Sequence, residues 1–169
     1  MDAIEAILMR RSIRRYTDAP VTDEEVETLL RAAMAAPSAA NKQPWHFVVV
    51  RDQGQRDAFA EFHPYAGMLR EAQVGVLVCG DTELELGDGY WIQDCSAATE
   101  NLLIAAHAIG LGAVWCGITP RADRVAQTQA LFGLPGNVIP LGMICVGHPA
   151  EEKGPGERYQ AERVHQDRW

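Results

Sequence analysis

Two apolar runs, residues 45–50 and 74–79, constrain the fold of this chain most strongly. Their sequences, WHFVVV and VGVLVC, consist almost entirely of β-branched, aromatic and other apolar residues. Such runs are typical of strands that other elements cover on both faces. The chain is therefore expected to bury a sheet between helices rather than to leave one face of it in water.

Helical patterns alternate with these strands. The apolar periodicity predicts helices over residues 2–10, 22–36, 53–62, 90–109 and 121–132, and further strands near 113–118 and 138–147. The first helix carries Ile4, Ile7 and Leu8 at helical spacing, and Thr22 with Glu25 has the spacing of a capping box. The class is therefore mixed α and β. The long connections permit parallel neighbours, and the strand order stays open.

The length and the special residues bound the class of protein. A chain of 169 residues predicts a single domain. It has no apolar run of membrane-spanning length and its first residues, MDAIE, do not resemble a signal peptide, so a cytoplasmic location is expected. The cysteines and histidines lack the spacing of a metal site, so buried reduced thiols and no metal are expected.

Residues 10–15, RRSIRR, concentrate positive charge in a chain whose formal net charge is −8. Nucleic acid is disfavoured as a partner, because the surrounding acidic surface would repel it. The run suits one compact anion such as a phosphate, since guanidinium groups bind phosphate bidentately and a serine hydroxyl adds a donor. The alternative is a solvated charge run at the end of a helix.

Residues 36–45, APSAANKQPW, form a predicted loop between a helix and a strand. Its small residues would let a ligand approach the backbone. The amides of Asn41 and Gln43 can both donate and accept, which matches the mixed edge of a heteroaromatic ring. The alternative is a plain turn bounded by prolines.

Residues 110–117, GLGAVWCG, follow the longest predicted helix. Their glycines do not form a dinucleotide fingerprint, because a helix precedes them and a strand follows. Gly117, at the end of that strand, would let the backbone approach a ligand closely. Cys116 is either a nucleophile or a buried thiol, and no activating neighbour can be identified in the sequence.

The last residues, from Pro149, are rich in Glu, Arg, Gly and Pro. Tyr159, Val164 and Trp169 are apolar anchors that a disordered tail would lack. An extended arm that lies along a surface is therefore predicted, and a partner subunit could supply that surface.

Taken together, these segments resemble the nitroreductase family of FMN-dependent oxidoreductases. The resemblance rests on the arginine run, the 36–45 loop, the helix motif Asp94-x-x-Ala97-Ala98-x-x-Asn101-Leu102, and the 110–117 segment. It implies an α+β fold in which helices flank a central mixed β-sheet, as one FMN-binding domain over residues 1–169. It also implies an intertwined homodimer, with FMN at the interface and a C-terminal arm from about 149 to 169.

The same resemblance implies which residues bind FMN. The phosphate and ribityl chain would be held from the arginine run, by Arg10, Ser12 and Arg14 with Arg11 alongside. The ring would be approached from the loop, by Pro37, Ser38 and Ala39, and reached by Asn41 and Gln43 from the second subunit. The backbone of Cys116 and Gly117 would lie by the flavin N5 edge. A C-terminal basic residue would add a phosphate contact, with Arg158 the first candidate and Lys153 the second.

The implied activity is ping-pong hydride transfer from NADH or NADPH through FMN to a nitroaromatic, quinone or flavin acceptor. No catalytic side chain is required, because the flavin N5 carries the chemistry. The alternatives are other flavin reactions, such as FMN breakdown or reductive dehalogenation, and a non-catalytic flavin-binding module. The 51–90 region is short compared with longer members, so the substrate cannot be inferred from the resemblance.

Overall fold

The central element is a four-stranded sheet in a computed structural model that describes residues 1–169. Its strands are β1 (Trp45–Val50), β2 (Val74–Asp81), β3 (Gly112–Gly117) and β4 (Val138–Gly147), in the order β1-β2-β4-β3. The α+β class is confirmed, but the sheet is antiparallel at every strand pair rather than mixed. An apolar run indicates that both faces of a strand are buried. It does not indicate whether the strand runs parallel or antiparallel to its neighbours.

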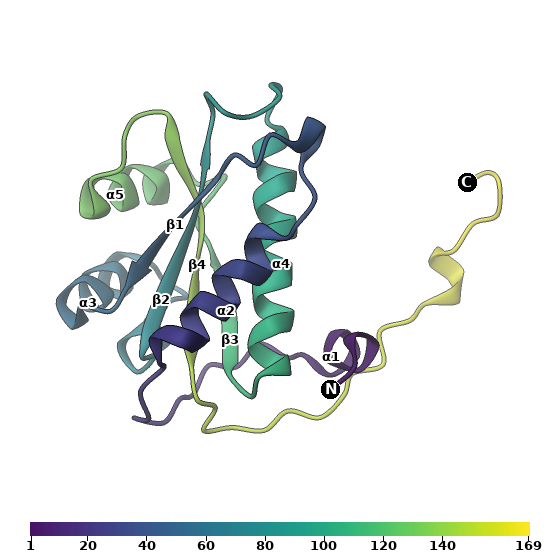
Figure 1. The fold of residues 1–169 in the computed structure, drawn as a ribbon, viewed down its shortest axis with the longest axis horizontal. Helices are drawn as coiled ribbons and strands as arrows, with labels where there is room; N and C mark the ends of the chain where they lie inside the picture. Colours follow the sequence, from purple (N-terminus) through teal and green to yellow (C-terminus); the bar gives the residue numbers. More distant parts are fainter.

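Two helical layers cover the sheet (Figure 1). On one face lie α2 (Asp23–Met34) and α4 (Tyr90–Ala108), and on the other lie α3 (Gln53–Phe62) and α5 (Ala122–Phe132). Alternate residues of β2 enter the two cores: Val76 packs with the α2/α4 layer and Leu77 with the α3/α5 layer. Both are fully buried, so the expectation of cover on both faces is confirmed for the run at 74–79. The run at 45–50 is only partly covered, because β1 is an edge strand on which His46 and Val49 are exposed.

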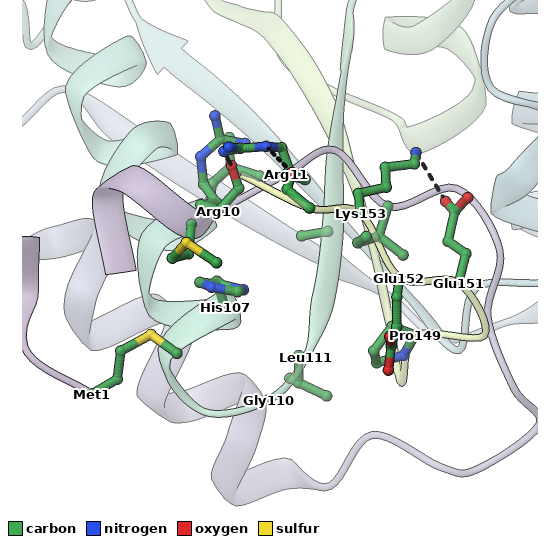
Figure 2. Close-up of a pocket in the computed structure, with 15 residues that line it drawn as sticks. Met1, Arg10, Arg11, His107, Gly110, Leu111, Pro149, Glu151, Glu152 and Lys153 are labelled. Carbon is green, nitrogen blue, oxygen red and sulfur yellow. Dashed lines mark hydrogen bonds and ion pairs between the residues drawn. The ribbon is translucent and has the colours of Figure 1, made fainter. Parts of the chain in front are cut away.

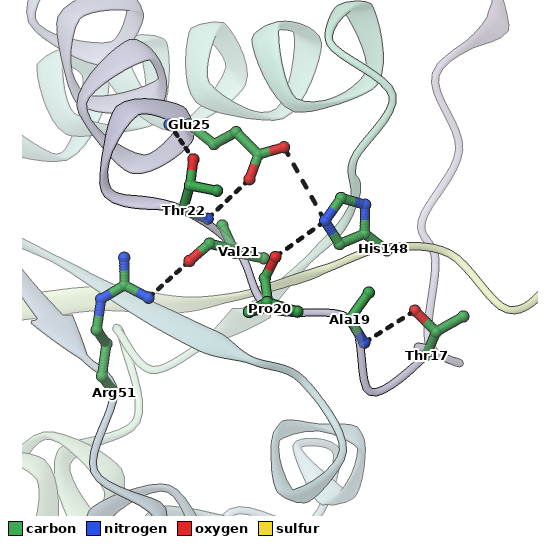
Figure 3. A network of polar contacts seen from close by, with 8 residues as sticks. All are labelled: Thr17, Ala19, Pro20, Val21, Thr22, Glu25, Arg51 and His148. Atoms are coloured by element: carbon green, nitrogen blue, oxygen red, sulfur yellow. Dashed lines mark hydrogen bonds and ion pairs between the residues drawn. The ribbon is translucent and has the colours of Figure 1, made fainter.

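A polar network fixes the start of α2 against the sheet (Figure 3). The predicted capping box is present: the Thr22 hydroxyl accepts from the Glu25 N–H at 3.1 Å, and the Glu25 carboxylate accepts from the Thr22 N–H at 2.8 Å. Such a cap contributes about 1 kcal/mol. Arg51, after β1, donates to the Val21 carbonyl at 2.8 Å, and His148, after β4, lies 3.2 Å from the Pro20 carbonyl.

Both ends of the chain lie outside this layered body. The first helix, α1 (Ala3–Met9), buries only Ala6, and its predicted stripe of Ile4, Ile7 and Leu8 is exposed within this chain. The C-terminal arm passes α1 and extends away from the sheet (Figure 1). Its Trp169 is fully exposed. The helix was predicted correctly, but no element of the same chain covers its apolar stripe.

None of the helices is long and apolar enough to cross a membrane. The four cysteines are free and buried, as expected.

Candidate functional site

A hollow of about 500 Å³ lies where β3 ends, and we call it the strand-end hollow. It is lined by Arg14, His63, Pro64, Tyr65, Gly67, Met68, Val114, Trp115, Cys116 and Gly117. The backbone of Gly117 contributes open space here, because a Cβ at this position would meet no atom within 4 Å. The volume falls within the usual range of small-molecule pockets.

The carbonyl of Gly117 accepts two side-chain hydrogen bonds. His63 Nε2 lies 2.9 Å from this oxygen and Arg124 Nη1 lies 3.1 Å from it. The Arg124 guanidinium also lies over the Tyr65 ring, 5.6 Å from its centroid. His63 follows α3 and Arg124 lies in the first turn of α5, so the α3/α5 layer positions this strand end.

The arginine run is an extended segment beside β3. The Ile13 N–H donates to the Ala113 carbonyl at 3.0 Å, and the Ile13 side chain lies so close that a Cβ at Gly112 would be 2.7 Å from it. This segment separates the arginines. Arg14 lines the strand-end hollow, whereas Arg10 and Arg11 line another cavity.

That second cavity, of about 430 Å³, lies between α1, the end of α4 and the segment after β4, and we call it the N-terminal cavity (Figure 2). Its lining includes Met1, Met9, Arg10, Arg11, Ile13, Leu103, His107, Leu111, Glu151 and Lys153. Three buried nitrogens of these residues have no hydrogen-bond partner in the chain: Arg11 Nη2, His107 Nε2, and Arg10 Nε, which is ion-paired with Glu100. Buried polar atoms without partners are uncommon, so they point to a group that this isolated chain does not supply.

The arginines of this cavity are held individually. Arg10 pairs with Glu100 at 3.3 Å and its side chain is only 16% exposed, which argues against a freely solvated charge run. Arg11 donates to the carbonyls of Leu8, Arg10 and Gly154 at 2.7–3.0 Å. Much of the Arg11 guanidinium is therefore engaged in holding the backbone.

Of the two C-terminal candidates, the fold brings Lys153 to the arginine run. Lys153 Nζ donates to the Ser12 carbonyl at 2.7 Å and pairs with Glu151 at 3.1 Å, and Glu151 accepts from the Arg14 N–H at 2.6 Å. Arg158 lies in the exposed arm and has no hydrogen bond or ion pair within the chain. The Glu151–Lys153 pair is visible in Figure 2.

The loop over residues 37–43 is ordered by its own contacts. Ser38 Oγ accepts from the Gln43 N–H at 2.9 Å, and Gln43 Nε2 donates to Asn41 Oδ1 at 2.8 Å. Ala40, Asn41 and Gln43 all have left-handed backbone, with φ of 49°, 54° and 50°. No residue of this loop lines either cavity. The fold therefore does not bring Pro37, Ser38, Ala39, Asn41 and Gln43 to the strand-end hollow of the same chain.

The motif on α4 supports this loop. Asp94, which is 5% exposed, accepts from the Ala39 N–H at 2.9 Å through Oδ1, and its Oδ2 is buried without a partner. Asn101, about two helical turns further along, donates to the Ala32 carbonyl at 3.1 Å and ties α4 to α2. The motif thus has a structural role that its sequence alone did not define.

Cys116 is enclosed rather than presented to solvent. Its Sγ lies 3.4 Å from the Tyr65 carbonyl and 3.9 Å from Cys145 Sγ, and the residue is 4% exposed. The hydrogen bond with the Cys145 thiol lowers the pKa of Cys116, burial opposes this, and the positive charge of Arg14 adds to the lowering. The enclosure favours the buried-thiol alternative for Cys116, which lines the strand-end hollow together with Arg14.

The residues that the sequence did not single out are His63, Tyr65 and Arg124. No periodicity or motif marks them, because their common feature is proximity to Gly117 in the folded chain. The segment HPY at residues 63–65 is only a break after a helix when it is considered alone.

Comparison with known proteins identifies the family. The Nitroreductase family model matches residues 7–82 and 63–148. A Methanothermobacter thermautotrophicus protein, provisionally named NADH dehydrogenase/NAD(P)H nitroreductase, is 46% identical over all of this chain and 88% of its own length.

Solved structures agree with this match. A Parabacteroides distasonis protein with the same provisional name has a TM-score of 0.95 at 41% identity, over 99% of this chain and 98% of that one. A Desulfovibrio desulfuricans protein, provisionally named a nitroreductase and solved in complex with FMN, has a TM-score of 0.87 at 36% identity, over 100% and 98% of the two chains. The arginine run, the 37–43 loop and the β3 end thus lie in a chain that belongs to the nitroreductase family.

Proposed function

We propose that this protein is an FMN-dependent oxidoreductase that takes hydride from NADH or NADPH and reduces a nitroaromatic, quinone or flavin acceptor. When bound, FMN would supply the hydride-accepting and hydride-donating N5. The order is ping-pong: the nicotinamide leaves the strand-end hollow before the acceptor enters it. The observation that carries the proposal is the open space at Gly117, with the Arg14 cation on the same hollow.

The residues present fit a flavin. The strand-end hollow offers backbone without a Cβ at Gly117, a cation at Arg14 and the exposed ring of Tyr65. A fixed cation beside a flavin ring stabilises the negative charge that develops on reduction. Arg10, Ser12 and Lys153 are proposed to hold the phosphate, with Arg11 fixing the backbone between them. Arg158 remains a candidate for the same role on a second copy, because its arm extends away from its own body.

We propose that the site is completed by a second copy of the chain. The 37–43 loop, with Pro37, Ser38, Ala39, Asn41 and Gln43, is ordered but lines neither the strand-end hollow nor the N-terminal cavity of its own chain. The apolar stripe of α1 and the anchors of the arm are exposed in the isolated chain. A homodimer that buries them and brings this loop to the partner's hollow accounts for both observations.

Two further statements belong to the proposal. Residues 1–169 form one FMN-binding domain, because both hydrophobic cores are built on the same sheet. The protein works in the cytoplasm, where NAD(P)H is available and its four free thiols stay reduced.

The test is anaerobic titration of the purified protein with NADH and with NADPH, followed by an acceptor screen. We expect a yellow protein whose flavin absorbance is bleached by a nicotinamide and restored by a nitroaromatic or a quinone. A protein that binds no FMN even after reconstitution would overturn the proposal. Bound FMN that neither nicotinamide bleaches would indicate a binding module instead, and bleaching with slow turnover of every such acceptor would indicate a different flavin reaction.

A further inference from the structure

The strand end at Gly117 must be both open and fixed in its backbone geometry, and a glycine favours only the first. Glycine keeps the strand-end hollow open there, since a Cβ would meet no protein atom and would occupy part of that volume. Glycine is also the residue with the most backbone freedom, which works against a fixed geometry. A glycine that lines a binding site therefore needs an external constraint if its peptide groups are to stay in one orientation.

The structure contains such a constraint on the peptide that joins Gly117 to Ile118. The carbonyl end accepts from His63 at 2.9 Å and from Arg124 at 3.1 Å, which uses both of its lone pairs. The amide end donates from Ile118 to the Leu141 carbonyl at 3.0 Å. Because a peptide unit is planar, bonds at both ends fix its orientation.

The contacts of His63 define which ring nitrogen carries the proton. Nδ1 lies 3.3 Å from the Tyr65 N–H, which can only donate, so Nδ1 accepts. Nε2 lies 2.9 Å from the Gly117 carbonyl, which can only accept, so Nε2 carries the hydrogen. The ring is 2% exposed and stacks on Phe59 with centroids 5.3 Å apart, which fixes its plane.

Arg124 brings a positive charge to the same carbonyl. Its guanidinium is held between the Gly117 oxygen and the Tyr65 ring. No carboxylate lies within ion-pair distance of it, in contrast to Arg121 at the start of the same helix, which lies 4.0 Å from Asp123. The charge of Arg124 is therefore not neutralised by a neighbouring acid.

We propose that His63 and Arg124 are positioning residues for the flavin reaction: together they clamp the Gly117 carbonyl, and Arg124 adds an unneutralised positive charge beside the reacting edge. The inference rests on the proposed function, because it needs FMN beside Gly117. His63 fixes the orientation of the backbone against which the ring lies. Arg124 favours the reduced flavin, because a nearby cation stabilises its added negative charge.

The charge effect is tested with Arg124→Gln, which keeps an amide donor and removes the charge. The matched control is Arg121→Gln, which makes the same change of charge at the same helix end. We expect Arg124→Gln to bind reduced FMN about tenfold less tightly relative to oxidised FMN, which lowers the two-electron midpoint potential by about 30 mV. Arg121→Gln is expected to leave the potential unchanged. Equal shifts in the two variants would overturn the role of Arg124.

The clamp is tested with His63→Asn, which keeps a polar group near the position of Nδ1 and removes the donor to Gly117. His63→Gln is the rescue variant, since its amide can donate from the ε position. We expect His63→Asn to slow flavin reduction about tenfold with little change in nicotinamide affinity, and His63→Gln to recover most of the rate. A rate that Gln does not rescue, or that Asn does not lower, would contradict the clamp.

A measurement on the apoprotein separates this inference from the proposed function. Nitrogen-15 NMR of the His63 ring is expected to show a protonated Nε2 and an unprotonated Nδ1 in the wild type. The opposite tautomer would overturn the clamp even if the enzyme reduces nitroaromatics. A protein with the expected tautomer that binds no FMN would instead overturn the proposed function, and the flavin role of the clamp with it.

Discussion

The strand-end hollow and the 37–43 loop are two differently built halves of one proposed site. The hollow is open space around a glycine whose peptide is fixed by side chains from two other elements. The loop lines neither cavity and is held by its own bonds and by Asp94 of α4, with three residues in left-handed backbone. One half is shaped to receive a ring, and the other is shaped to project polar groups.

The loop also shows what it would present to a ring. The bond from Gln43 Nε2 to Asn41 Oδ1 uses one donor and one acceptor. It leaves Gln43 with a free carbonyl oxygen and Asn41 with free N–H groups, a mixed pair that suits the edge of a heteroaromatic ring. Both halves are thus ordered within each chain before any ligand binds, which limits the entropy lost on binding. What a single chain lacks is the contact between them.

Removal of residues 157–169 is expected to have the largest effect on the proposed site, because it tests whether a second copy of the chain brings the two halves together. The truncation leaves the Lys153 contact with Ser12 intact. We expect the mass measured by light scattering to fall toward the monomer, and FMN affinity to fall on the order of 1000-fold, since several hydrogen bonds of about 1 kcal/mol each would be lost.

The control for the truncation is a full-length chain with alanine at Tyr159, Val164 and Trp169, the exposed anchors of the arm. If burial of these side chains holds the arm on a partner, this variant weakens the dimer nearly as much as the truncation. A truncated protein with an unchanged mass and unchanged FMN affinity would show that the halves meet without the arm.

The helices and strands could be predicted because buried apolar residues recur at the spacing of each element. The strand predicted over 138–147 and the helix predicted over 53–62 coincide with β4 and α3. Strand direction could not be predicted, since residues with both faces buried look alike in either direction. The stripe of Ile4, Ile7 and Leu8 shows a second limit: periodicity predicts that a face is to be covered, but not by which chain.

The site was predictable only where its residues are contiguous. The arginine run, the 36–45 loop and the 110–117 segment each carry several chemically distinctive residues in a short stretch. His63 lies 54 positions before Gly117, and no local pattern marks it as part of the same site. The division of the arginine run was also hidden, because it depends on the extended backbone beside β3 that directs Arg14 to one cavity and Arg10 to the other.

Single replacements of Arg10 and Arg14 by alanine measure how much the arginine on each cavity contributes to FMN binding. Each charge-assisted contact to a ligand is worth about 1.5–3 kcal/mol, so each variant is expected to bind FMN about 10- to 150-fold more weakly. Arg15→Ala is the matched control, because Arg15 ends the same run and lines neither cavity. Calorimetric titration of the apoproteins measures all three. If Arg15→Ala weakens FMN binding as much as the others, only the general positive field of the run matters.

The smallest expected effect concerns Asp94, which anchors the projecting half without touching the receiving half. Asp94→Ala leaves the partly buried N–H of Ala39 without its acceptor, which is expected to lower the free energy of unfolding by about 1–3 kcal/mol. Asp94→Asn keeps an acceptor oxygen and is expected to unfold close to the wild type in urea. If the loop acts as one preformed half, Asp94→Ala also weakens FMN binding while the His63 tautomer, which belongs to the other half, stays unchanged. A change in that tautomer would show that the halves are coupled within each chain, and the two-half description would then be wrong.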